Sequence, residues 1–131
     1  MRVLLNSWVL ACALLASGCT LEAPEDPNAG PVPTWCQDIR PILEAHCVSA
    51  CHGATTTGSG RTDFRLDMYE ADGEVAGAKL MAPRIHARTV TFRTMPPPGN
   101  PEPTEAERAL IDRWAAGGAP ACAETVTDGG S

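Results

Sequence analysis

The sequence predicts an all-α domain of three to four helices with long loops. Apolar residues recur at helical spacing in several segments, and Thr104-Glu105-Ala106-Glu107 has the pattern of a capping box that starts a helix. With only 2 Phe and 1 Tyr among 131 residues, the chain is also poor in the aromatic residues that β-sandwiches use. The 12 Gly and 12 Pro indicate long irregular connections between the helices.

The first 18 residues are predicted to be an export signal. Arg2 supplies a positive start, and residues 8–16 form a short apolar run that is followed by small residues, as in signal peptides. No apolar run in the chain reaches the roughly 18 residues that indicate a membrane-spanning helix. Residues 1–18 are therefore expected to act as a signal peptide and not to form part of the folded domain.

The end of this segment, Ala16-Ser17-Gly18-Cys19, resembles the lipobox of bacterial lipoproteins. The resemblance implies that Cys19 carries lipid and tethers the exported chain to a membrane, which two or more acyl chains do firmly. Ala16 departs from the family, where leucine is the norm at that position. Thr20, rather than Asp, follows the cysteine, and by resemblance to the Gram-negative sorting rule this favours the outer membrane. The alternative is an ordinary signal peptide cleaved nearby, which would leave a soluble exported protein.

Three further regions follow the signal. Residues 19–33 are rich in proline and acidic residues and have almost no large apolar side chains, so we expect an extended tether. Residues 34–123 hold the helical domain. Residues 124–131 are polar and small and are expected to form a flexible tail.

The first helix is predicted over residues 34–47, where Ile39, Ile42 and Leu43 recur at helical spacing. Pro41 lies inside this stretch and lacks the backbone N–H that a helix interior uses. It therefore either kinks the helix or marks the start of its regular part.

A polar loop over residues 53–62 is expected to separate this helix from a second one over residues 73–81. Pro83 is expected to interrupt the second helix, because proline breaks the hydrogen-bond pattern. Residues 84–88 are expected to add another turn.

The last helix has the clearest boundaries. It follows three consecutive prolines at 96–98, which lack N–H donors and favour an extended backbone. It begins at the capping box and ends at Gly117-Gly118. Its apolar stripe consists of Leu110, Ile111, Trp114 and Ala115.

Charge and motifs exclude several classes of function. The 16 acidic residues outnumber the 10 basic ones, for a net charge of −6, so the chain lacks the basic surplus of nucleic-acid-binding proteins. No Ser/His/Asp set, paired carboxylate motif or phosphate-binding loop is evident, so we expect no enzyme. The acidic surface favours a basic protein partner, attracted by complementary charge.

The most informative stretch is Cys47-Val48-Ser49-Ala50-Cys51-His52. Covalent attachment of a c-type haem requires two thiols and an imidazole directly after the second, usually as C-x-x-C-H. Here three residues separate the two cysteines. The alternatives are a local disulfide between Cys47 and Cys51, or a zinc site completed by His46 or His86.

With this motif, residues 35–120 resemble the small bacterial single-haem c-type cytochrome domains that often follow an export signal. An apolar helix over residues 39–43 leads into the motif, and Gly53 follows it. Met95-Pro96-Pro97 is similar to the methionine loop of that family. The capped last helix then carries Ile111-Asp112-Arg113-Trp114 and ends in Gly117-Gly118-Ala119.

The resemblance implies a cytochrome c-like fold around one covalent haem c and a function in single-electron transfer. Cys47 and Cys51 would form the thioethers, and His52 would be the proximal iron ligand. Met95 would be the sixth ligand, which raises the reduction potential relative to bis-His ligation. The alternative sixth ligands are Met81, Met68 and His86.

The same resemblance implies that the two ends of the domain lie together, and with this a disulfide between Cys36 and Cys122. Either thiol could instead stay free, which is unusual in an exported protein. Several arginines flank the expected pocket, and one or two could pair with the haem propionates: Arg61, Arg65, Arg84, Arg88 and Arg93.

Two other functions remain open at this point. One is a non-haem envelope lipoprotein, stabilised by disulfides, that serves binding or structure. The other is a haem sensor or small peroxidase in which Met95 dissociates and opens the iron.

Overall fold

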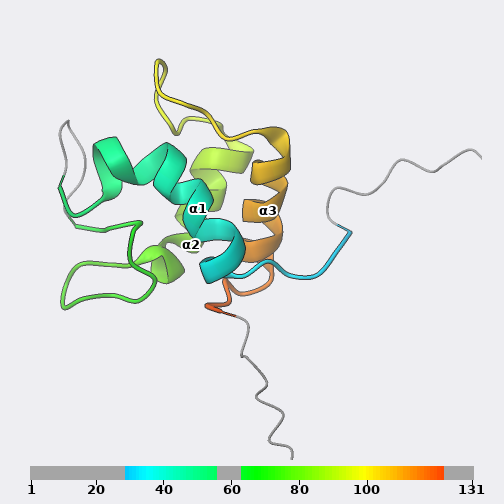
Figure 1. Ribbon diagram of the computed structural model, residues 1–131, viewed down its shortest axis with the longest axis horizontal. Helices are drawn as coiled ribbons and strands as arrows, with labels where there is room; N and C mark the ends of the chain where they lie inside the picture. The colour runs from blue at the N-terminus through cyan, green and yellow to red at the C-terminus, as the bar shows by residue number, and fades with distance from the viewer. Residues whose placement is uncertain (1–28, 56–62, 123–131) are drawn as a thin grey trace, which may run out of the picture.

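The computed structural model describes residues 29–55 and 63–122 (Figure 1). The predicted export signal, the lipidation site Cys19, Arg61 and the tail over residues 124–131 lie outside these ranges, as does most of the tether. Within the two ranges, none of the helices is both long and apolar enough to cross a membrane.

The described chain is helical, as predicted for the fold class. Its elements form three rods in sequence order: η1 (Trp35–Ile39), α1 (Arg40–Leu43) and η2 (Glu44–His52), then α2 (Ala78–His86) and η3 (Ala87–Thr91), then α3 (Glu105–Ala116). In the described ranges, β-pairing is limited to two isolated bridges, Phe64 with Ala76 and Asp72 with Val75. Figure 1 shows the three rods gathered together, with long loops projecting from them.

The first rod is longer than the sequence predicted. It runs from Trp35 to His52 without a break, whereas the prediction ended it at Cys47. Pro41 lies at the start of α1, so the regular α-helical part begins there, which was one of the two expected outcomes. The segments on either side, η1 and η2, are wound as π-helix, with i→i+5 hydrogen bonds. The spacing of apolar residues therefore no longer follows the α-helical repeat after Leu43, and the sequence did not predict the continuation of the rod.

The predicted start of the second helix was wrong, because α2 begins at Ala78 and not near residue 73. Gly77 precedes it in an extended conformation. A Cβ at Gly77 would lie 2.3 Å from the Glu70 carbonyl oxygen and 2.4 Å from that of Tyr69, so the chain passes directly over this backbone before the helix begins. Such a backbone contact leaves no signal in the periodicity of apolar residues.

The expected interruption at Pro83 was also wrong. The α2 helix continues through Pro83 to His86, and η3 extends the rod to Thr91. A proline inside a helix costs about 3 kcal/mol. Ala82 and Ile85, on either side of it, are buried in the core, and this burial favours an uninterrupted rod.

The third rod confirms the predicted capping box. The Thr104 hydroxyl accepts a hydrogen bond from the Glu107 amide at 3.2 Å, and the Glu107 carboxylate accepts one from the Thr104 amide at 2.7 Å. This amide hydrogen bond is the main reason why the pKa of Glu107 is lowered from its ordinary value. The helix ends at Ala116, directly before the predicted glycine pair.

The three rods share one apolar core. Its largest fully buried side chains are Trp114, Ile39, Leu43 and Ile111. The rings of Trp35 and Trp114 lie 6.2 Å apart and join the first rod to the third. The Trp114 indole nitrogen donates to the Pro120 carbonyl at 3.1 Å, which holds the end of the domain against the core.

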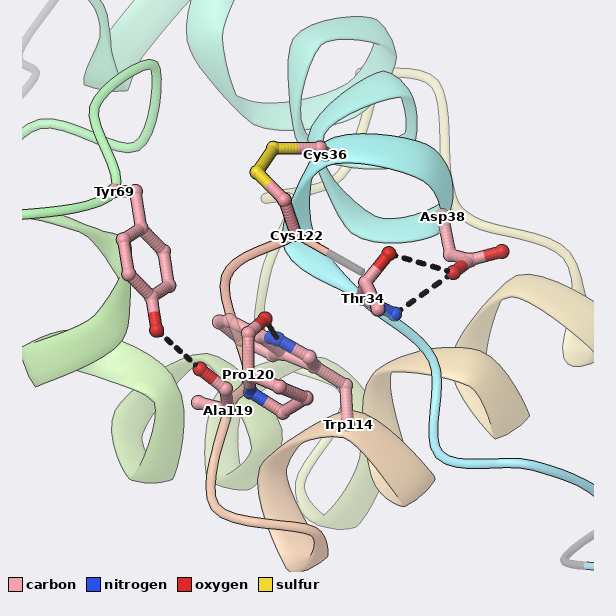
Figure 2. Close-up of a disulfide and its surroundings, with 8 residues drawn as sticks. All are labelled: Thr34, Cys36, Asp38, Tyr69, Trp114, Ala119, Pro120 and Cys122. Atoms are coloured by element: carbon pink, nitrogen blue, oxygen red, sulfur yellow. Dashed lines mark hydrogen bonds between the residues drawn. A yellow bond between two sulfur atoms is a disulfide. The ribbon is translucent and has the colours of Figure 1, made fainter. Parts of the chain in front are cut away.

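The disulfide between Cys36 and Cys122 is present, as the resemblance implied (Figure 2). The Cα atoms of the two cysteines are 5.1 Å apart, within the usual range for disulfides. Two main-chain hydrogen bonds lie beside it, from the Trp35 amide to Pro120 at 2.9 Å and from the Cys36 amide to Ala121 at 3.0 Å. The two ends of the domain are therefore joined by both covalent and hydrogen bonds.

Candidate functional site

One cavity collects the four residues that the sequence proposed for cofactor binding. Cys47, Cys51 and His52 reach it from η2, and Met95 reaches it from the loop after η3. The cavity measures about 240 Å³, somewhat less than the roughly 300 Å³ at which small-molecule pockets begin. Met95 is 39% exposed. A bound group larger than the cavity would therefore reach solvent on the Met95 side.

The orientation of His52 depends on the segment that follows the motif. Its ring stacks on Phe64, with the ring centres 4.7 Å apart and the planes inclined by 21°. The Leu66 amide donates to the His52 carbonyl at 2.7 Å. Phe64 and Leu66 are themselves buried in the core. The imidazole is thus held at the cavity wall by residues more than ten positions away.

The Met95 loop is held at its beginning by η3. The amides of Thr94 and Met95 both donate to the carbonyl of Arg88, at 2.8 and 3.2 Å. These bonds bring the thioether of Met95 to the same wall as the Arg88 side chain. The backbone hydrogen bonds to Arg88 thus hold Met95 at the cavity.

The far end of this loop is held by the first rod. The His46 Nδ1 atom lies 3.1 Å from the Pro101 carbonyl, and Nε2 lies 3.4 Å from the Glu107 carboxylate. From the sequence, His46 was considered only as a residue that could complete a zinc site. The structure shows that it connects η2, which carries both thiols, with the loop that carries Met95.

Arg108 is a buried residue that the sequence analysis missed. Its guanidinium donates to the Thr89 carbonyl and pairs with Glu102 at 3.0 Å, so it joins α3, η3 and the Met95 loop. Only 4% of the residue is exposed. The available signal was its position three residues before Ile111, on the apolar face of the helix.

Of the four candidate arginines that the structure describes, Arg84 and Arg88 line the cavity. The Arg84 guanidinium lies 5.8 Å from the centre of the Phe64 ring. Arg65 pairs instead with Asp67, and Arg93 with Glu105. Among the residues that the structure describes, no Asp or Glu lines the cavity. This wall is therefore basic, although the chain as a whole is acidic.

The structure separates the alternative sixth ligands. Met81 of α2 lines the cavity, whereas Met68 and His86 do not. The His86 Nε2 atom lies 2.8 Å from Asp112, so it faces α3. His86 thus forms a partly buried contact between two rods.

The two motif thiols are free in the structure, and both are partly buried. Burial, together with the negative charge of the neighbouring Cys51 when ionised, raises the pKa of Cys47 from 9.0 to about 12. Cys47 is therefore a neutral thiol at physiological pH.

Slow alkylation of Cys47 is the expected result for the folded, haem-free protein. Thiolate is the reactive form, so at pH 8 iodoacetamide should modify Cys47 at least about 100-fold more slowly than in the chain unfolded by denaturant. Mass spectrometry of Cys47 peptides after timed alkylation measures both rates, and equal rates would contradict the prediction. Because folding raises the pKa of Cys47, the buried neutral thiol makes its full contribution to the free energy of unfolding below about pH 9. It is lost as the pH rises towards 12.

The donor set at the cavity fits a covalent haem c. Two thiols, an imidazole and a thioether are the groups that such a haem takes from protein, and the rest of the wall is largely apolar, with Phe64, Leu66 and Ile85 among its residues. Over residues 29–55 and 63–122, no group of three or more His, Cys, Asp or Glu side chains lies close enough to hold a metal ion.

In comparisons with known proteins, no protein-family model, no curated protein and no solved structure matches the chain.

Proposed function

We propose that the protein is a c-type cytochrome that is exported, tethered to a membrane by lipid on Cys19, and carries single electrons. The observation that supports this most strongly is the meeting of Cys47, Cys51, His52 and Met95 at one cavity. Three of them come from one rod and the fourth from a loop more than 40 residues later. The fold would then be the cytochrome c-like arrangement that the sequence resembles.

Each group at the cavity has a distinct role in this proposal. The thiols of Cys47 and Cys51 would hold haem covalently, each by addition across one of its two vinyl groups, with no group released. The His52 imidazole and the Met95 thioether would hold the iron. When bound, haem c supplies a single iron centre that gains and loses one electron. Arg84 and Arg88 provide positive charge for its propionates.

The remainder of the chain holds these ligands in place. Phe64 fixes the plane of the His52 ring, and the Arg88 carbonyl fixes the backbone at Met95. Ligands that do not move between oxidation states keep the reorganisation on electron transfer small. The net charge of −6 favours a redox partner with a basic surface.

Covalent haem is the decisive observable. We expect protein expressed with the c-haem maturation machinery to retain one haem per chain after denaturing extraction. Its pyridine haemochrome should have the α-band of a haem with two thioethers. Cys47→Ser and Cys51→Ser should each move this band to the position for one thioether. A chain without covalent haem would overturn the proposal and leave a disulfide-stabilised protein.

A further inference from the structure

The spacing of the cysteine motif presents a geometric problem if the rod were an ordinary α-helix. An α-helix turns by about 100° per residue. Around the helix axis of a C-x-x-C-H motif, the second cysteine then lies about 60° to one side of the first cysteine, and the histidine lies about 40° to the other side. In C-x-x-x-C-H the same winding would turn the histidine about 140° away from the first cysteine. His52 would then leave the face that carries the thiols.

In the structure, the backbone around the motif is not wound as an α-helix. The η2 segment, Glu44–His52, contains the whole motif and is wound as π-helix. Its hydrogen bonds join residues five apart, which corresponds to about 4.4 residues per turn and about 82° per residue. Cys51 then lies about 30° to one side of Cys47, and His52 about 50° to the other. This arrangement is close to that of an α-helical C-x-x-C-H.

The backbone directly after the motif is tightly packed on η2. A Cβ at Gly53 would lie 2.9 Å from the carbonyl oxygen of Val48 and 2.9 Å from its Cγ1 atom, so Gly53 packs directly on the residue five positions earlier. Gly53 is buried. Because the first of these atoms belongs to the backbone, it cannot move aside cheaply. The glycine after His52 is thus the residue that permits the close approach.

We propose that the π-winding of η2 compensates for the extra residue in the motif and makes C-x-x-x-C-H equivalent to C-x-x-C-H as a haem-attachment site. A π-helical turn contains almost one residue more than an α-helical turn, so it accommodates the extra residue between the two cysteines. Both thiols and the imidazole therefore remain on the cavity wall. This inference rests on the proposed haem function. It concerns how the residues of η2 are arranged to serve that function.

The test measures winding and attachment separately. Scalar couplings across backbone hydrogen bonds in the ferrous protein identify the carbonyl that accepts from the His52 amide. The π-winding predicts the carbonyl of Cys47, whereas α-winding predicts that of Val48. The pyridine haemochrome counts the thioethers in the same sample. Both measurements use the unmodified chain and do not depend on whether any variant folds.

Two matched variants change the spacing in opposite directions at the exposed Ser49. Deletion of Ser49 creates C-x-x-C-H, and we expect two thioethers with the coupling moved to an acceptor four residues earlier. Insertion of one alanine after Ser49 creates a spacing that neither winding accommodates, and we expect no more than one thioether. Circular dichroism and tryptophan fluorescence establish that each variant is folded.

The outcomes distinguish the two proposals. A wild-type chain with two thioethers whose His52 amide couples to Val48 would overturn the inference alone. Two thioethers in the folded insertion variant would also overturn it, because winding would then not limit attachment. A wild-type chain without covalent haem would overturn the proposed function, and the inference with it. Coupling to Cys47 together with two thioethers would support both.

Discussion

Removal of the Cys36–Cys122 disulfide is expected to lower the free energy of unfolding by about 4.5 kcal/mol. The two cysteines are 86 residues apart, and the chain-entropy model assigns about this value to a closed loop of that length. A domain of this size has a total stability of only about 5–15 kcal/mol. The variant with Cys36→Ser and Cys122→Ser should therefore lie near the limit of folding.

Urea unfolding followed by tryptophan fluorescence measures this effect well, because Trp35 and Trp114 are buried next to the bridged ends. The wild-type protein in reducing agent is the matched control, since it loses the same bond without a change of sequence. Single replacement of Cys47 is a second control and leaves the bridge intact. A loss below about 1 kcal/mol would show that the main-chain hydrogen bonds to Pro120 and Ala121 suffice to hold the ends together.

Met95→Ala is expected to leave haem attached and to lower its reduction potential. The thioethers at Cys47 and Cys51 do not depend on Met95, so attachment is retained. A thioether ligand raises the potential, and axial ligands as a group span roughly 0.8 V. We expect a fall on the order of 0.1 V, a modest part of this range. Redox titration followed by visible absorption measures it.

Met81→Ala is the matched control for this experiment. Met81 also lines the cavity, but it belongs to α2 and packs against the core. We expect its replacement to leave the potential close to that of the wild type. A potential unchanged by Met95→Ala, or lowered by Met81→Ala instead, would assign the sixth ligand to Met81 or to another group.

The prediction of a haem site depends on residues that lie close together in the sequence. Cys47, Cys51 and His52 could be recognised because the chemistry of attachment requires them in one short stretch. Met95 could be proposed only through the family resemblance, because nothing local to its loop links it to the motif. The structure brings the four to one cavity, and their role as haem ligands stays a prediction.

The alternatives that the sequence left open were separated by packing. His86 and Met81 are equally plausible as isolated ligand types, and they belong to the same helix. In the structure Asp112 of α3 holds His86 away from the cavity, while Met81 faces it. Arg108 shows the same limit, since its burial depends on acceptors in η3 and the Met95 loop.

The all-α class, the start and end of α3 and the position of the cysteine motif could be predicted from the order of residues alone. The capping box of Thr104 and Glu107 forms within four residues, and local hydrogen bonds can be predicted from local spacing. The start of α2, its continuation through Pro83 and the π-winding of η2 could not be predicted in this way and became known from the structure. The start of α2 and its passage through Pro83 depend on packing against other parts of the chain, and the free energy of those contacts outweighs local preference.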